Sequence, residues 1–370
     1  MNAILKLIKK DLVLTASLIL LVVLLSLFPE FIKKYPSFVN WRTIFSLGGL
    51  ILITTGIRNS NYFEHLTVKL LRNFKSERKL FISVVLFSAF LSTFLTNDIT
   101  LFIVVPLTIS ISLALENDIG KLLIFETIAV NVGSALTPIG NPQNIFIYRR
   151  WDVPFDEFIF KMLPVTLLMM VLLVLLIIVF SSGRNLRIKK GIQMAQIDRP
   201  LFYLSIVLLV LFIVAMEVNI EPYAFFMVLI IYLLLRKEVI IKSDWLLLLL
   251  FVIFFVDFGV LGNLEFIRRF MLSLNLESGK MIFATSSLLS QIMSNVPAGI
   301  FMANFTNKWL PIAYGVNVGG NGIIIASLAN LITLRLSARR DFAWRFHFYS
   351  IPFFIISFFL TLIFIIPIFQ

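Results

Sequence analysis

Long apolar runs recur from one end of this sequence to the other. Each reaches or approaches the ~20 residues that an α-helix needs to cross the hydrocarbon core of a bilayer. The runs are continuous blocks of Leu, Ile, Val and Phe, unlike the short alternating segments of a membrane β-barrel. They predict an all-α polytopic membrane protein. Four of them are Leu12–Phe28, Phe155–Phe180, Leu201–Met216 and Phe348–Ile368.

The charged residues agree with this class. Only 14% of the 370 residues are charged and 59% are hydrophobic, whereas about 25% of a soluble domain is charged. The formal net charge of +12 could indicate a nucleic-acid partner. However, the basic residues gather between the apolar runs, which is the positive-inside pattern, so we expect a lipid bilayer and no nucleic acid as the partner. These segments are Arg58–Lys79, Arg184–Arg199, Arg236–Lys242 and Arg335–Arg345.

Placing the basic segments in the cytoplasm gives a topology for the whole chain. It has about nine spanning helices, two of them broken, plus two re-entrant hairpins, in the cell (inner or plasma) membrane. One hairpin turns at Thr96-Asn97-Asp98 and enters from inside, and the other turns at Ser294-Asn295 and enters from outside. The amino terminus is then cytoplasmic and the carboxyl terminus is outside.

This topology divides the chain into five segments. Residues 1–79 are scaffold spans 1 and 2 with a cytoplasmic amphipathic loop that we expect on the membrane surface. Residues 200–278 are the scaffold spans of the second half, and 181–199 are a cytoplasmic linker. Residues 80–180 and 279–370 are two transport repeats, each with a hairpin, a broken helix and a further span.

Two short motifs occur in the same order in both halves. LSTFLTNDIT at Leu91–Thr100 matches LSQIMSNVPA at Leu289–Ala298 in its Leu-Ser and in its hydroxyl-Asn pair. NVGSALTPIGNPQN at Asn131–Asn144 matches NVGGNGIIIASLAN at Asn317–Asn330, since both open with Asn-Val-Gly and close with Asn. Because the two hairpins enter from opposite sides, the halves are predicted to be inverted repeats. Paired interrupted helices in such repeats indicate a secondary transporter with its site near the bilayer midplane.

The breaks in these helices are expected to supply the binding groups. Pro138 and Pro142 lack amide donors and Gly140 permits unusual φ angles, so the first break is nearly enforced. The second break, Gly319-Gly320-Asn321-Gly322, is flexible instead. Helix amino termini at a break attract an anion, while carbonyl, Asn and hydroxyl oxygens suit a hard cation such as Na⁺. We therefore expect one composite site for a small anion and coupling cations, with no metal or cofactor beyond Na⁺.

Several intramembrane polar residues also have a purely structural interpretation. An Asn inside a span is often an interhelical hydrogen-bonding residue. Asp98 could carry a proton or Na⁺, or could only cap its hairpin, because Val296 occupies its place in the second half. Asp257 could be structural, and Glu126 could either face the cytoplasmic vestibule or be structural.

The hairpin and break motifs resemble those of the ion transporter superfamily. The likeness covers about residues 80–150 and 280–335. The Asn-Asp tip followed by an apolar run to Pro is most similar to the arsenite permease branch and to related bacterial anion permeases. The hydroxyl-Asn tips are also similar to the Ser-Asn-Thr signatures of the divalent-anion/Na⁺ symporters. The resemblance implies a homodimer in which a transport domain moves against a scaffold by an elevator motion.

The resemblance also implies roles for particular residues. The third hydroxyl of a Ser-Asn-Thr tip is replaced here by Asp98 and by Val296, which weakens the case for a dicarboxylate substrate. By this likeness the hydroxyl-Asn tips contact substrate and ion, and Gly and Asn residues of the breaks line the sites. The predicted substrate-binding residues are Thr96, Asn97, Asn141, Ser294, Asn295 and Asn321, and the predicted ion-coupling residues are Asn97, Asp98, Gly133, Thr137, Asn295 and Gly319.

The sequence thus favours a secondary active transporter of a small anion or oxyanion, coupled to Na⁺ or H⁺. A Na⁺/H⁺ antiporter with Asp98 as the ion carrier is the alternative. A channel is a third interpretation, because GNPQN and SNVPA resemble the paired half-helices of water channels, although only one contains Asn-Pro. We expect no enzyme activity, since no Gly-x-Gly-Asp protease motif occurs.

Overall fold

The computed structural model describes residues 12–62, 76–114, 120–181, 183, 185, 196–337 and 341–368. Within these residues the chain is helical and forms no β-strand, apart from one isolated bridge between Ser76 and Asn185. The predicted all-α class is therefore confirmed. Residues 63–75 of the predicted surface loop and most of the predicted linker 181–199 lie outside the described residues.

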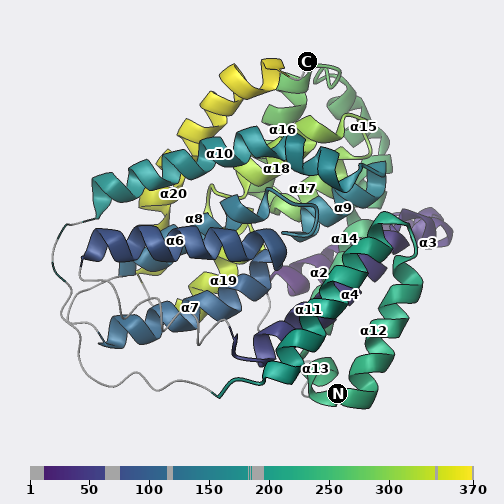
Figure 1. The fold of residues 1–370 in the computed structure, drawn as a ribbon. Helices are drawn as coiled ribbons and strands as arrows, with labels where there is room; N and C mark the ends of the chain where they lie inside the picture. The colour runs from purple at the N-terminus through teal and green to yellow at the C-terminus, as the bar shows by residue number, and fades with distance from the viewer. Residues whose placement is uncertain are drawn as a thin grey trace.

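Figure 1 shows the helices in chain order. The first half contains α2 (Leu12–Leu27), η1 (Pro29–Lys34), α3 (Tyr35–Phe38), α4 (Trp41–Asn59), α6 (Glu77–Phe94), α7 (Asn97–Ala114), α8 (Gly120–Ser134), α9 (Pro142–Trp151) and α10 (Phe155–Phe180). The second half contains α11 (Arg199–Glu217), α12 (Glu221–Leu235), α13 (Lys237–Lys242), α14 (Trp245–Asn263), α15 (Glu265–Leu272), α16 (Gly279–Met293), α17 (Asn295–Met302), α18 (Trp309–Gly319), η2 (Ile324–Ala326), α19 (Leu328–Ser337), α20 (Phe342–Leu360), η3 (Thr361–Ile365) and η4 (Ile366–Ile368).

Several of these helices are long and apolar enough to cross a membrane. They are α10, α11, α14 and the continuous helix Phe342–Ile368, and α2 forms a further candidate with the segment after it, bent by 113°. The sequence predicted α10 with the same bounds. The predicted total of nine spans, and the orientation of the two termini, remain predictions.

The helix ends gather on two opposite faces. Where α4 ends and α11 begins, the amide of Asp198 donates to the carbonyl of Ser60 at 3.0 Å. Beside them, the Arg58 guanidinium donates to the carbonyl of Lys242 at 3.4 Å. We call this the basic face, because the predicted cytoplasmic segments begin and end here. The other ends of α4, α11 and α12 meet around Arg42 and Glu221 on what we call the opposite face.

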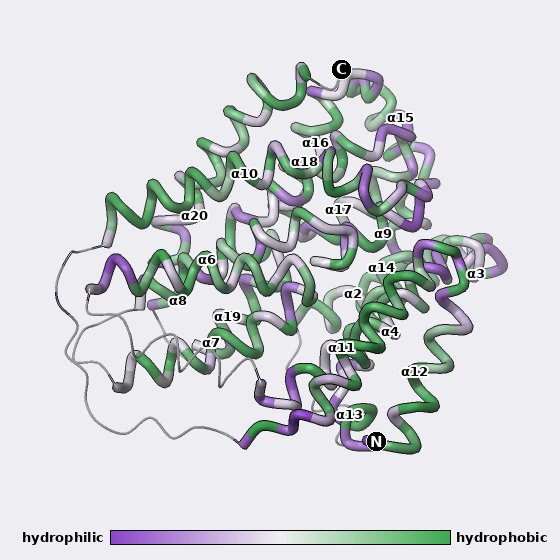
Figure 2. Tube along the Cα trace, viewed as in Figure 1, coloured by the Kyte–Doolittle hydropathy of each residue, from purple (hydrophilic) through white to green (hydrophobic). Residues whose placement is uncertain are grey.

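Hydrophobic residues predominate along the outer helices of the assembly as well as along the inner ones (Figure 2). On α10, Leu167, Val171 and Leu175 are exposed and recur every four residues, so they form one apolar stripe. Helices α11, α12 and α20 carry similar exposed apolar side chains. Soluble proteins rarely expose such continuous apolar surface. The assembly is therefore suited to a lipid surround, as expected of a polytopic membrane protein.

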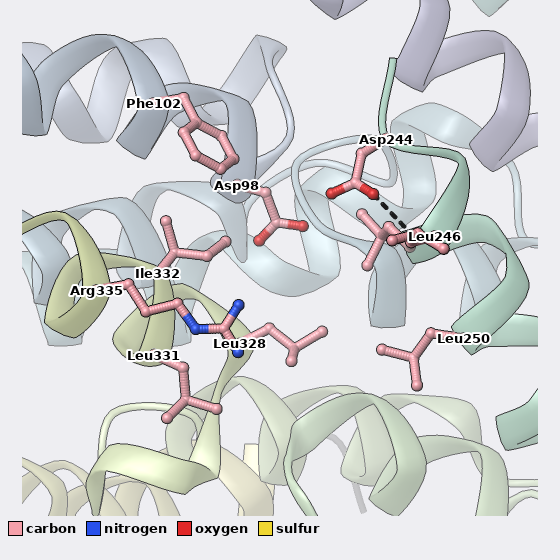
Figure 3. Close-up of a pocket in the computed structure, with 10 residues that line it drawn as sticks. Asp98, Phe102, Asp244, Leu246, Leu250, Leu328, Leu331, Ile332 and Arg335 are labelled. Carbon is pink, nitrogen blue, oxygen red and sulfur yellow. Dashed lines mark hydrogen bonds between the residues drawn. The ribbon is translucent and has the colours of Figure 1, made fainter. Parts of the chain in front are cut away.

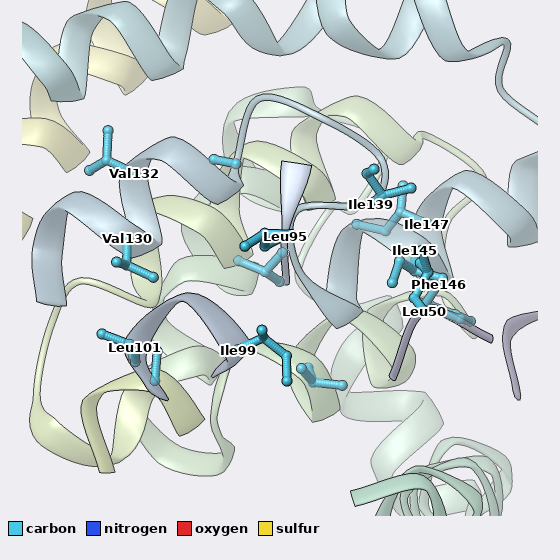
Figure 4. Close-up of a cluster of buried hydrophobic side chains, with 14 of the residues drawn as sticks. Leu50, Leu95, Ile99, Leu101, Val130, Val132, Ile139, Ile145, Phe146 and Ile147 are labelled. Atoms are coloured by element: carbon cyan, nitrogen blue, oxygen red, sulfur yellow. The ribbon is translucent and has the colours of Figure 1, made fainter. Parts of the chain in front are cut away.

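The broken helix α8–α9 lies at the centre of the core. Every residue of α8 except Lys121 is buried, and α9 is buried from Pro142 to Arg149. Non-helical backbone is tolerated at membrane depth only where protein or a watery cavity surrounds it. Figure 4 shows the apolar side chains that do so here, among them Leu95, Ile99, Leu101, Val130, Val132, Ile139 and Ile145.

Candidate functional site

The first predicted hairpin turns where the sequence placed it. Helix α6 ends at Phe94, and α7 begins at Asn97. The Asn97 side-chain oxygen accepts from the Asp98 amide at 3.0 Å, and the Asn97 amide donates to the carbonyl of Gly140 at 2.8 Å. Thr96, Asn97 and Asp98 are all buried. The tip of this hairpin therefore rests on the break between α8 and α9.

The second hairpin turns at Ser294, between α16 and α17. Ser294 has φ 74° and ψ 157°, a region that only glycine adopts freely and that costs other residues about 1–3 kcal/mol. Ser294 and Asn295 are buried. A Cβ added to Gly320 would lie only 2.8 Å from the side-chain nitrogen of Asn295. The Asn295 side chain is therefore packed against Gly320, and this tip rests on the break between α18 and α19.

The two broken helices are joined by reciprocal asparagine pairs. The side-chain nitrogen Nδ2 of Asn131 donates to Asn330 Oδ1 at 2.9 Å. The side-chain nitrogen Nδ2 of Asn317 donates to Asn144 Oδ1 at 2.8 Å. Asn131 and Asn317 open the two aligned motifs, and Asn144 and Asn330 close them. In each pair, the opening residue of one half therefore contacts the closing residue of the other.

The closing asparagines also hold their own breaks in the same way. The Asn144 amide nitrogen donates to the carbonyls of Ser134 at 3.2 Å and of Thr137 at 3.0 Å. The Asn330 amide nitrogen donates to the carbonyls of Gly320 at 3.0 Å and of Ile323 at 3.3 Å. These acceptors occupy the fourth and seventh places of both motifs. In each break, one Asn side chain thus donates to the buried backbone carbonyls that have left the helical hydrogen-bond pattern.

Gly133 and Gly319, both predicted for the ion site, lie at close helix contacts. A Cβ on Gly133 would lie 2.1 Å from the Ala89 carbonyl oxygen on α6. A Cβ on Gly319 would lie 2.8 Å from the Ser287 carbonyl oxygen on α16. Packing against the first arm of each hairpin therefore accounts for both glycines, and their part in ion coupling stays a prediction.

The other predicted residues of the breaks differ in how fully they are bonded. The Asn141 amide nitrogen donates to Asn317 Oδ1 at 3.0 Å, and its oxygen accepts from the Asn144 amide at 2.9 Å. The Thr137 hydroxyl donates to the Thr93 carbonyl at 2.5 Å. Both side chains are therefore engaged in the scaffold of the break. Asn321 is fully buried and its side-chain oxygen has no hydrogen-bond partner.

A cavity of about 550 Å³ opens at the basic face between α7, α14 and α19. Figure 3 shows the Asp98 and Asp244 carboxylates directed into it, with the Arg335 guanidinium on its other side. One oxygen of Asp98 is buried and has no hydrogen-bond partner. The remaining wall is apolar and includes Phe102 and Ile332. Asp98 is thus the predicted residue that a solute could reach from this face.

A second cavity, of about 300 Å³, lies at the opposite face between α9, α14 and α17. It is lined by Phe146, Ile300 and Arg150, together with residues that precede α4. When the aligned motifs are extended by two residues, Ile300 of this cavity takes the place of Phe102 in the first cavity. Likewise, Phe146 of this cavity takes the place of Ile332 in the first. The two cavities are therefore lined by matching positions of the two halves, and α14 borders both.

The sequence analysis missed several polar residues of this site. The four asparagines that begin and end the aligned motifs were not assigned to the site, although both halves share them, and this repetition was a usable signal for a role there. They are Asn131, Asn144, Asn317 and Asn330. Gln143 is also buried, and its side-chain oxygen has no partner. No group of three His, Asp or Glu side chains that could hold a metal ion occurs in the part of the chain that the structure describes.

A family model described as Citrate transporter matches residues 3–308. The chain belongs to the citrate transporter family. The inner membrane protein YbiR of Escherichia coli is 39% identical over 336 residues, which are 90% of each chain. An uncharacterized transporter of Methanocaldococcus jannaschii is 39% identical over 302 residues, 81% of this chain and 82% of that protein. A Dictyostelium discoideum protein provisionally named transporter arsB is 29% identical over 137 residues, 37% of this chain and 24% of that protein.

Membership of the citrate transporter family confirms the resemblance to the ion transporter superfamily. The chain is a multi-pass membrane transporter. Its family and the Methanocaldococcus jannaschii relative are named as transporters and not as enzymes, which confirms the expectation of no enzyme activity.

Proposed function

We propose that this member of the citrate transporter family is a secondary active transporter of a small anion or oxyanion, coupled to H⁺ or Na⁺. The substrate would bind where the hairpin tips meet the helix breaks. The two halves would be inverted repeats, and the transport segments would move against the scaffold as an elevator.

The observation that carries this proposal is the meeting of four helix starts at one buried centre. Helices α7, α9, α17 and α19 all begin at a tip or a break, and the reciprocal asparagine pairs join these breaks. Backbone amides at helix starts present partial positive charge to an anion. Half-helix starts serve this purpose in transporters with inverted repeats. Unpaired oxygens of Thr100, Gln143 and Asn321 remain beside this centre.

The two cavities support alternating access. One opens at each face, and matching positions of the two halves line them. Helix α14 borders both, so a movement of the hairpins and broken helices along α14 would widen one cavity as it closes the other. The predicted homodimer would hold the scaffold still during this motion.

The substrate class follows from the charges near the site. The cavity at the opposite face contains Arg150 and no acid, which favours an anion. The family description makes citrate the first probe, and the arsenite permease-like tip makes arsenite the second. Because Asp98 and Val296 replace the third hydroxyl of a Ser-Asn-Thr tip, a carboxylate substrate would be held mainly by helix starts and Asn side chains.

A Na⁺/H⁺ antiporter remains the second candidate. The observation that favours it is the shared cavity of Asp98 and Asp244, because two carboxylates with one guanidinium suit a cation better than an anion. In this case Asp98 would carry the ion alone, and no anion would be needed for transport.

Counterflow in proteoliposomes separates these candidates. The purified protein is reconstituted with unlabelled citrate or arsenite inside, and uptake of the same labelled anion is followed without an ion gradient. The proposal predicts transient accumulation of at least one of the two anions, and a changed cation dependence in Asp98→Asn. Sodium–proton exchange in vesicles that contain neither anion, abolished by Asp98→Asn, would instead establish the antiporter.

A further inference from the structure

A buried carboxyl group outside both cavities joins the first hairpin to the first broken helix. Glu126 lies in the second turn of α8 and has no exposed surface. The Ser88 hydroxyl on α6 donates to Glu126 Oε1 at 3.2 Å. The Thr108 hydroxyl on α7 donates to the same oxygen at 3.0 Å. One oxygen of Glu126 therefore holds both arms of the hairpin against α8.

The two oxygens of Glu126 are not equivalent. Oε1 accepts both hydroxyl hydrogen bonds, whereas Oε2 is buried and has no partner. This pattern fits a neutral carboxyl group, in which Oε1 is the carbonyl oxygen and Oε2 carries the proton. A carboxylate at the same place would leave a charge with two hydrogen bonds on one side and none on the other, which is costly in a buried site.

Glu126 is not paired with a cation in the part of the chain that the structure describes. The hydrogen-bond partners found there for its carboxyl group are the two hydroxyls on Oε1. The titratable side chains on the helices packed around α8 lie elsewhere. Through Phe125, α8 contacts Tyr349 of α20, and His347 of the same helix accepts from the backbone amide of Ile324. The remaining groups on these helices are Glu77, Arg78 and Lys79 at the start of α6, Asp98 at the start of α7, Asp156, Glu157 and Lys161 at the start of α10, Arg335 at the end of α19, and Arg345 and Tyr314 on α20 and α18.

The second half shows what happens without the acid. There Ile312 occupies the position of Glu126, and Ser286 occupies that of Ser88. The Ser286 hydroxyl donates to the carbonyl of Ile282 in its own helix at 2.7 Å. Where no carboxyl group faces it, the serine therefore bonds to a carbonyl of its own helix. This difference indicates that the Glu126 carboxyl group is the reason that Ser88 bonds to α8 instead. The link between hairpin and broken helix by a carboxyl group exists in one half only.

We propose that Glu126 is the site of the coupling proton, an inference that rests on the proposed transport function. When Oε2 is protonated, the neutral acid holds α6 and α7 against α8, and the protein crosses between its two states with the substrate at the hairpin tips. When the O–H bond breaks and the proton passes to water, the remaining carboxylate needs solvent and the hairpin opens. Glu126 is six residues, or about 9 Å, from the start of α8, where Lys121 donates to the carbonyl of Phe180 at the end of α10. Opening of the hairpin at this end would give the carboxylate access to water. This leaves Asp98 to bind Na⁺ or to shape the cavity.

The test compares Glu126→Gln with wild type in proteoliposomes. The amide keeps an acceptor for both hydroxyls but cannot release a proton, so counterflow of citrate or arsenite should stay within about twofold of wild type. Accumulation driven by a pH gradient, which reaches up to about tenfold per pH unit for one coupled proton, should be lost in the variant. Asp257→Asn, which changes another buried carboxyl group on α14, should keep proton-driven accumulation.

Proton-driven accumulation by Glu126→Gln at the wild-type level would overturn the inference. A loss of proton-driven accumulation in Asp257→Asn, with no such loss in Glu126→Gln, would overturn it as well. Infrared titration of the purified protein tests the same point without a substrate. One carboxyl band should titrate with pH in wild type and be absent in Glu126→Gln, and an unchanged titration would contradict the inference. If wild type transports neither anion, the proposed function fails while the infrared result still decides the state of Glu126.

Discussion

The amide nitrogen of Asn317 donates to Asn144 Oδ1 at 2.8 Å, although the two residues are 173 positions apart in the chain. Its counterpart, the bond from Asn131 to Asn330, measures 2.9 Å. Each bond runs from the helix before one break to the helix after the other break. The two breaks are consequently held as one unit, and this unit is where the hairpin tips rest.

Removing Asn144 should weaken this unit. Asn144→Ala removes three hydrogen bonds to the carbonyls of Ser134, Ala135 and Thr137 and one from the Asn317 side chain. The carbonyls of Ser134 and Thr137 and the Asn317 side chain each keep a second partner. Each of these four lost hydrogen bonds contributes about 0.5–1.5 kcal/mol, so we expect a loss of at least about 2 kcal/mol in the free energy of unfolding. Thermal unfolding in detergent measures it. The control Asn263→Ala removes one bond within an exposed helix end and should change little.

The close contacts of the two hairpin arms predict unequal effects of added methyl groups. Gly133→Ala places a Cβ 2.1 Å from the backbone oxygen of Ala89, which must move. Gly319→Ala meets the Ser287 oxygen at 2.8 Å and should be milder. Overpacking of this kind costs about 1–3 kcal/mol. Gly299→Ala, whose nearest neighbour lies at 3.8 Å, is the matched buried control. Equal stability of all three variants would show that the helices do not approach so closely.

Two substitutions of Ser294 separate the effect of backbone strain from that of substrate binding at the second hairpin tip. Ser294→Gly relieves the cost of φ 74°, about 1–3 kcal/mol, and should raise thermal stability. Ser294→Ala keeps the strain and should leave stability nearly unchanged. Both variants lack the hydroxyl, so both should lose anion counterflow if Ser294 binds the substrate. Full counterflow in Ser294→Ala would remove this residue from the site.

A buried ion pair ties the first broken helix to the scaffold at the opposite face. Arg149 on α9 lies 3.4 Å from Glu221 at the start of α12, and donates to the Met216 carbonyl at 2.5 Å. Arg149→Ala removes a charge beside Glu221 and the bond to Met216, while Glu221 keeps its ion pair with Arg42. We therefore expect a loss of about 1–3 kcal/mol in the free energy of unfolding. Arg269→Ala, which breaks an exposed pair with Glu265, should cost less than about 1 kcal/mol. A comparable loss in both variants would contradict this role of Arg149.

The sequence predicted the parts of this fold that depend on local composition. Thr96-Asn97 and Ser294-Asn295 turn their hairpins as expected, since a polar pair inside an apolar run has few other places to go. The break around Gly140 was predicted from its glycine and two flanking prolines, and the break around Gly320 from a run of flexible glycines. Short helices such as α3 and α13 were not predicted, because they are too brief to show an apolar period.

What the sequence left open was which residues meet. The alignment of the two halves marked Asn131 and Asn330 as shared, but it could not say that the opening residue of one motif contacts the closing residue of the other. Arg149 and Glu221 lie in separate segments, and only the packing of α9 against α4, α11 and α12 brings them together. Glu126 was recognised without its partners for the same reason, because Ser88 and Thr108 come from two other helices.

Reciprocal access to the two cavities is the most direct test of this account. The chain contains no cysteine, so Phe102→Cys and Ile300→Cys each introduce a single reporter, one in each cavity. Labelling by a membrane-impermeant maleimide is measured from each side of oriented vesicles, with and without citrate or arsenite. Alternating access predicts that the two positions react from opposite sides, and that a condition which increases one reaction decreases the other. Simultaneous rise of both reactions under one condition, as in an open channel, would contradict it.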